Sequence, residues 1–123
     1  MIKAVCLLLP VLVLAAGCSR PQEYTAADLI RTLKEHNDAD MCGWAARELG
    51  RVPRQDAPAC VKPLTEALQD PHDDVRMAAA YALADLGKDA APAVPALKKL
   101  SQDGAPQVRQ AVAYAVKEIQ RAK

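Results

Sequence analysis

Aromatic residues are scarce in this chain of 123 residues: they make up 3% of it, and phenylalanine is absent. Hydrophobic residues nevertheless amount to 51%, so the core has to be built from alanine, leucine and valine. Strands favour aromatic and β-branched residues, whereas alanine and leucine are strong helix formers. The composition therefore argues against a sheet and predicts an all-α fold of closely packed helices.

An excess of one charge is also missing, because 16 Lys and Arg stand against 15 Asp and Glu. Proteins that bind nucleic acid usually carry a large positive charge that displaces counterions from the phosphates. We therefore expect no nucleic-acid partner.

Side chains typical of catalytic sites are few and scattered. Serine occurs only at positions 19 and 101, and threonine only at positions 25, 32 and 65. The glycines are isolated, so the sequence contains no glycine-rich loop that could bind a phosphate. We expect no catalytic residue and no cofactor, and we do not expect an enzyme.

Metal ligands are equally sparse. Beyond the N-terminal segment, the His and Cys residues occupy positions 36, 42, 60 and 72, and these separations match no common structural-zinc spacing. The aspartates within residues 70–74 are better explained by a helix cap and a solvated turn than by a weak calcium site. We therefore expect no metal.

The first 18 residues are typical of an export signal. Lys3 precedes an apolar run over residues 4–16, which is shorter than the roughly 20 residues that a membrane-spanning helix needs. The run leads into Leu14-Ala15-Ala16-Gly17-Cys18, which resembles the lipobox of bacterial lipoproteins. The resemblance implies cleavage before Cys18 and lipidation of that residue. A plain secretory signal and an uncleaved N-terminal anchor are the alternatives.

This interpretation divides the chain into a signal peptide (residues 1–17), a lipidated Cys18 with a short tether (residues 18–24), and a folded domain (residues 25–123). Ser19 follows the cysteine, where Gram-negative lipoproteins retained in the inner membrane usually carry Asp. For a Gram-negative source, the resemblance therefore implies attachment to the outer membrane, facing the periplasm. Several acyl chains, at about 0.8 kcal/mol per buried CH₂, would make this attachment stable.

The folded part contains an internal repeat of 33 residues. Aligning residues 61–87 with residues 94–120 gives ten identities in 27 positions. Each unit is predicted to hold two helices, the second of which carries an apolar stripe at helical spacing. A degenerate unit precedes them, and its Leu49-Gly50 matches the Leu86-Gly87 that ends the next unit. We expect about three helix pairs, over residues 25–50, 58–87 and 91–121.

The second helices follow a pattern of Asp, Val-Arg, two spaced alanines and Leu-Gly that resembles HEAT repeats, including those of phycobilisome lyases. The match is close over residues 70–87 and looser over residues 103–119. The resemblance implies an α-α superhelix that serves as a binding scaffold. It also implies that repeats are linked through Asp70, Arg76, Asp103 and Arg109. Ala39 stands where the first unit would carry this arginine.

Two cysteines, Cys42 and Cys60, remain once Cys6 is assigned to the signal and Cys18 to the lipid. An even number of cysteines in an exported protein favours a disulfide. A bridge would close a loop of about 19 residues and add roughly 3 kcal/mol of stability. Two buried thiols are the alternative.

The aromatic residues are the best indication of a binding surface. Trp44, Tyr81 and Tyr114 occupy the same position in successive units. At 100° per residue, Tyr81 lies off the core stripe and on the same side as Met77. Stacking would place the three rings in a row, which suggests that these four residues contact a partner. The alternative is that each ring packs between adjacent second helices.

These observations predict function only by class. The first hypothesis is a membrane-tethered scaffold that binds an envelope protein or peptide along its second helices. The second is an accessory or assembly factor for an enzyme or a chromophore-attachment system, which would need a reactive thiol or a chromophore pocket. The third is a purely structural spacer.

Overall fold

The computed structural model describes residues 24–122. The expected signal peptide and the lipidation site at Cys18 therefore lie outside the described residues. Within the described range the chain contains helices but no strand, which confirms the all-α prediction. The α-helices are α2 (Ala26–Glu35), α3 (Ala39–Leu49), α4 (Ala57–Ala67), α5 (Asp73–Leu86), α6 (Val94–Lys99) and α7 (Pro106–Arg121).

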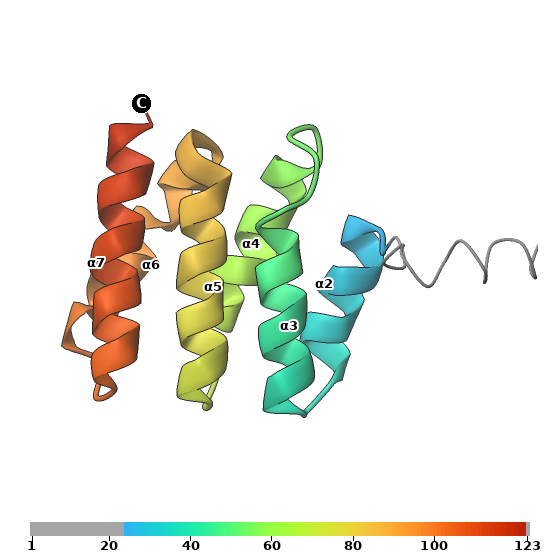
Figure 1. The fold of residues 1–123 in the computed structure, drawn as a ribbon, viewed down its shortest axis with the longest axis horizontal. Coiled ribbons are helices and arrows are strands. Elements are labelled where there is room, and N and C mark those ends of the chain that lie inside the picture. Colours follow the sequence, from blue (N-terminus) through green and yellow to red (C-terminus); the bar gives the residue numbers. More distant parts are fainter. Residues whose placement is uncertain (1–23, 123) are drawn as a thin grey trace, which may run out of the picture.

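The helices are arranged as a short solenoid of three pairs, as predicted. The second helices of the pairs, α3, α5 and α7, lie side by side in one layer, and α4 and α6 lie behind them (Figure 1). Helix α5 packs against both α3 and α7, so the middle helix joins the first pair to the last. This arrangement leaves one face of the second helices open along the array.

Local signals in the sequence explain where the helices begin and end. The Thr25 side chain accepts a hydrogen bond from the backbone N–H of Asp28, and the Asp28 carboxylate accepts from the backbone N–H of Thr25. This reciprocal capping satisfies two amides at the start of α2. Asp38 caps α3 in a similar way. Helix α5 ends at Leu86, and the following Gly87 has a φ of +62°, which is accessible to glycine without strain.

Small residues let the second helices approach one another closely. A Cβ atom at Gly50, just after α3, would lie 2.8 Å from the Cα of Ala82 on α5. The core stripe of α5 is likewise rich in alanine, and Ala78, Ala79 and Ala82 are all buried. The absence of phenylalanine is therefore compensated by short distances between helices rather than by large side chains.

Prolines lie next to two of the helix starts. Pro71 lies in the turn before α5, and the helix begins two residues later at Asp73. In the third unit a 3₁₀ helix, η1 (Gly87–Ala93), follows α5 directly, and Pro95 lies in the first turn of the short α6. A second 3₁₀ segment, η2 (Leu100–Gln102), ends this half of the unit.

Candidate functional site

An exposed aromatic pair lies on the open face of the second helices. Tyr81 comes from α5 and Tyr114 from α7, and the two residues are 41% and 46% exposed. Their ring centroids are 5.7 Å apart and their planes are inclined by 52°, which is within the range of favourable aromatic contacts. The rings therefore support each other while keeping much of their surface in solvent.

Trp44 does not continue this pair into a single row. It is partly buried on α3 and contacts Tyr24 edge to face, with ring centroids 5.0 Å apart. The expected row of three rings is therefore two pairs in the described part of the chain, Tyr24–Trp44 and Tyr81–Tyr114. Tyr24 had been assigned to the tether. Its place just before the capping residue of α2 is where a hydrophobic side chain often packs against the helix.

Met77 lies one turn before Tyr81 on α5. It is partly buried and packs against the core. Its side chain therefore offers less surface to a partner than the tyrosines do.

A groove of about 380 Å³ opens beside Trp44, between α3 and the start of α5. It is hollowed at Gly43, where an added Cβ would meet no atom within 4 Å. Charges of both signs surround the indole ring. The residues that line the groove are Ala39, Asp40, Gly43, Trp44, Arg47 and Asp74. An aromatic floor with Arg and Asp at its edge suits an extended peptide segment better than a small apolar ligand.

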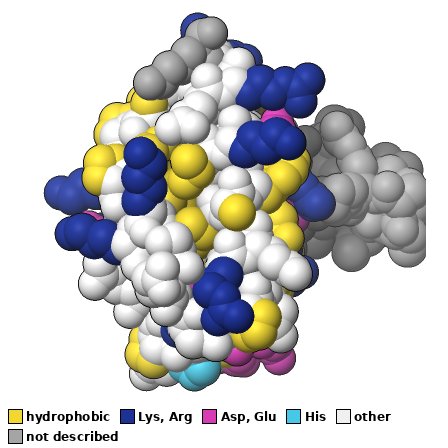
Figure 2. Space-filling model, turned by 90° about the vertical axis from the view of Figure 1, so that its left-hand side faces the viewer, with side chains coloured by type: hydrophobic (Ala, Val, Ile, Leu, Met, Phe, Trp, Pro, Cys, Tyr) yellow, Lys and Arg dark blue, Asp and Glu magenta, His cyan; other side chains and the backbone are white. Residues whose placement is uncertain are grey.

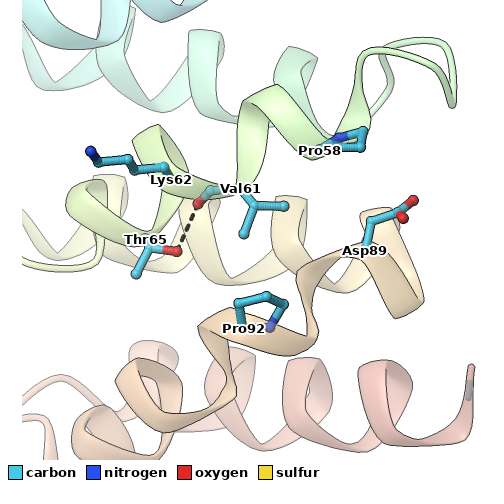
Figure 3. Close-up of a pocket in the computed structure, with 6 residues that line it drawn as sticks. All are labelled: Pro58, Val61, Lys62, Thr65, Asp89 and Pro92. Carbon is cyan, nitrogen blue, oxygen red and sulfur yellow. Dashed lines mark hydrogen bonds between the residues drawn. The ribbon is translucent and has the colours of Figure 1, made fainter.

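A second groove, of about 410 Å³, lies between α4 and η1 (Figure 3). Its floor is formed by the apolar side chains of Pro58, Val61 and Pro92, with Lys62 and Asp89 on opposite sides. The Thr65 hydroxyl donates to the carbonyl of Val61 at 2.7 Å, so its proton is already used within the helix. The polar groups do not converge on one point, and this groove has no resemblance to a catalytic site.

The predicted link between repeats is present between the second and third units. The Arg76 guanidinium donates from Nε and Nη2 to the two carboxylate oxygens of Asp103, at 2.9 and 3.1 Å. It also donates from Nη1 to the carbonyl of Asp70 at 2.8 Å. These bonds from Arg76, with one from the backbone N–H of Ala105, hold the pKa of the Asp103 carboxyl below its ordinary value. The pair ties α5 to the turn before α7.

The link is incomplete at both ends of the array. The carboxylate of Asp70 accepts from the backbone N–H of His72 at 2.9 Å instead of from an arginine of the first unit, where Ala39 occupies the corresponding position. Arg109 donates to the carbonyls of Asp103 and Gly104, at 2.6 and 3.2 Å. The assigned linking roles therefore differ: Arg76 and Asp103 join two units, while Asp70 and Arg109 act within their own.

The expected disulfide between Cys42 and Cys60 is not formed: both residues are buried free thiols. Each thiol is engaged locally. The Cys42 thiol donates to the carbonyl of His36 at 3.0 Å, and the Cys60 thiol to that of Asp56 at 3.3 Å. The Cys42 Sγ is thus directed at the end of α2 and the Cys60 Sγ at the start of α4, so a bridge would require both side chains to leave these partners.

The thiols are also poorly suited to nucleophilic chemistry. Burial raises the pKa of Cys42, with further contributions from the negative charges of Asp70 and Asp38. Burial and the nearby Asp56 raise the pKa of Cys60 in the same direction. Reactive cysteines have a lowered pKa and are accessible to solvent. Among residues 24–122, no three His, Cys, Asp or Glu residues lie close enough to hold a metal ion.

Comparison with known proteins agrees with this architecture. A family model described as HEAT repeats matches residues 26–117, about three quarters of the chain. A search of curated proteins gave no significant match. None of the helices in the described range is long and apolar enough to cross a membrane.

Proposed function

The chain belongs to the HEAT-repeat family, and from this premise we propose that it is a protein-interaction scaffold whose second helices bind a partner segment. The observation that carries the proposal is the exposed pair of Tyr81 and Tyr114, 5.7 Å apart on adjacent helices. Tyrosine is enriched in the energetically important part of interfaces because it combines a large apolar ring with a hydrogen-bonding hydroxyl.

The groove beside Trp44 extends this surface toward the first unit. It shares α5 with the aromatic pair, because Asp74 on its rim and Tyr81 lie on the same helix. A partner segment that crosses α3, α5 and α7 would meet the indole ring, charges of both signs, and then the two phenol rings. We infer an extended or helical peptide segment with at least one apolar anchor as the ligand class.

We further propose that the scaffold is tethered to a membrane of the bacterial envelope through a lipid on Cys18. The support is the lipobox-like Leu14-Ala15-Ala16-Gly17-Cys18 after a short apolar run. Fully extended, residues 19–24 would reach only about 20 Å. The tethered domain would therefore search for envelope proteins within a shallow layer near the bilayer, which raises its effective concentration toward them.

A role without catalysis, cofactor or nucleic acid is part of the same proposal. The raised pKa values of both buried thiols argue against the accessory role that would need a reactive cysteine. A purely structural spacer is the remaining alternative, and it makes no use of exposed rings.

Replacing Tyr81 and Tyr114 with Ala tests the proposal against the spacer. The scaffold predicts that the double variant keeps a melting temperature close to that of the unchanged chain but no longer retains its envelope partner. A large loss of thermal stability with unchanged partner retention would favour the spacer. Tethering is tested separately by Cys18→Ser, which should abolish incorporation of labelled palmitate and release the protein from membranes.

A further inference from the structure

Helix α7 is the last helix in residues 24–122, and the middle of the chain shows how a following unit covers such a helix. On α5, the stripe that faces α7 begins at Arg76, which bonds to Asp103, and continues to Gly87, which lies next to Ala122. The residues between them on this stripe, Ala80, Leu83 and Ala84, are buried at 0%, 0% and 8% exposure. This is the surface that one unit presents to the next.

The equivalent stripe on α7, which we call the end face, is not covered by another helix of the described residues. It consists of Arg109, Ala113, Val116, Lys117 and Gln120, each 33 positions after its counterpart on α5. Ala113 and Lys117 are exposed where Ala80 and Ala84 are buried, and Val116 is only partly covered where Leu83 is fully covered. Two of the five positions are apolar, and the alanine would let a helix approach closely.

Arg109 retains the donors that its counterpart uses to hold the next unit. Both hydrogen bonds of its guanidinium to described residues come from Nη1, and both go to backbone carbonyls. On Arg76, the equivalent Nε and Nη2 atoms bind the Asp103 carboxylate. The end face therefore presents an arginine fork in the geometry that matches a carboxylate.

The charge in the part of the chain that carries the end face is positive, like that of Arg109. Residues 94–122 contain five basic and two acidic residues, whereas residues 24–93 contain eight basic and twelve acidic ones. One of the two acidic residues, Asp103, is already paired with Arg76. In the view onto this end, Lys and Arg side chains surround an apolar centre (Figure 2). The five basic residues in positions 94–122 are Lys98, Lys99, Arg109, Lys117 and Arg121.

We propose that the end face binds an acidic amphipathic helix of a partner protein, which stacks on α7 as α7 stacks on α5, with a carboxylate of the partner bound by Arg109. This site is distinct from the aromatic surface on the second helices. The proposal goes beyond the scaffold function, and it does not depend on the lipid anchor.

A designed peptide can serve as the probe. It carries the sequence of residues 101–121, so that it presents to Arg109 the surface that α7 presents to α5, including Asp103. On its outer side, a hydrocarbon staple joins positions 113 and 117 to hold it helical, and Arg109→Glu and Gln120→Glu make it acidic. Its binding to the purified protein is measured by fluorescence anisotropy.

We expect saturable binding that weakens about tenfold for the protein variant Arg109→Ala, and as much for a peptide carrying Asp103→Asn. Combining both changes should weaken binding little further, because the two groups form one contact. Lys62→Ala, on α4, removes one positive charge away from the end face and should leave binding unchanged.

Three results with the stapled peptide would overturn the proposal: no binding, equal weakening by Arg109→Ala and Lys62→Ala, or independent effects of Arg109→Ala in the protein and Asp103→Asn in the peptide. Independent effects would also be observed if the peptide displaced α7 and bound Arg76 instead of Arg109. Vesicles containing phosphatidylglycerol are tested in parallel. Stronger Arg109-dependent binding to them than to the peptide would assign the end face to an anionic bilayer and contradict the proposal. None of these results tests the proposed binding of a partner by Tyr81 and Tyr114.

Discussion

The guanidinium of Arg76 and the carboxylate of Asp103, 27 positions apart in the chain, form a two-pronged ion pair that joins the second unit to the third. The side chains are only 17% and 8% exposed, so water screens the pair less than it would a surface salt bridge. The same arginine also binds the carbonyls of Asp70 and Pro71. One side chain therefore fixes both the turn before α5 and the turn before α7.

Replacing Arg76 with Ala should lower the free energy of unfolding by about 2 kcal/mol, because it leaves the Asp103 carboxylate without its charged donors. Arg109→Ala is the matched control, since Arg109 has the same place in its unit but bonds only to backbone carbonyls. Urea denaturation should show a clearly larger loss for Arg76→Ala. Equal losses would mean that the link to the next unit adds nothing to stability.

The stabilisation by this pair should depend on pH. The hydrogen bonds from Arg76 and Ala105 hold the pKa of Asp103 in the folded protein below its ordinary 3.8. A lowered folded-state pKa gives stability that is fully present above the unfolded value and is lost as the pH falls through the folded value. The difference in unfolding free energy between the unchanged chain and Arg76→Ala should thus be constant near neutrality and shrink below about pH 4. A difference that stays constant down to pH 2 would contradict this account.

The first unit lacks the linking arginine, and Ala39→Arg should supply it. The new guanidinium would occupy the place that Arg76 has in the next unit, with the carboxylate of Asp70 as its acceptor. We expect a gain of about 0.5–1 kcal/mol in urea denaturation, because the new pair is partly exposed. Ala39→Lys adds the same charge without the planar fork and should gain less. The prediction fails if the gain persists when Asp70 is also replaced with Asn.

Cys42 and Cys60 should behave as inert, reduced residues. Burial raises the pKa of both thiols, so the thiolate that reacts with alkylating agents is scarce and shielded. Peptide mapping after iodoacetamide treatment should show slow labelling of both residues in the native protein and complete labelling in guanidinium. A Cys42–Cys60 linked peptide from protein purified without reductant would refute the free-thiol state.

Much of the fold follows from the sequence because each repeat carries its own local signals. The expected start of the first unit at residue 25 agrees with the start of α2. Leu86-Gly87 predicted the end of α5, and the 33-residue period predicted the stacking that brings Tyr81 next to Tyr114. The pair of Arg76 and Asp103 came from the family resemblance rather than from spacing. These features depend on contacts that recur in every unit, so one pattern determines several of them.

The features that could not be predicted depend on departures from the repeat. Trp44 matches Tyr81 in sequence, but it lies in the first unit, where Tyr24 lies against it and covers part of the ring. The disulfide was inferred from the number of cysteines and from the expected compartment. Neither contains information on where the two cysteine side chains point. Whether Cys42 and Cys60 can meet depends on the path of the connector between α3 and α4, and that path has no counterpart in the later units.

The scaffold function is tested most directly by crosslinking in the native envelope with a photoreactive residue at position 81 or 114. The account predicts one discrete crosslinked species, shared by both positions, that disappears when the other tyrosine is replaced with Ala. A photoreactive residue at position 62, on α4, should not form this species. Absence of a discrete product at both tyrosine positions, or the same product from position 62, would contradict the assignment of the second helices as the binding surface.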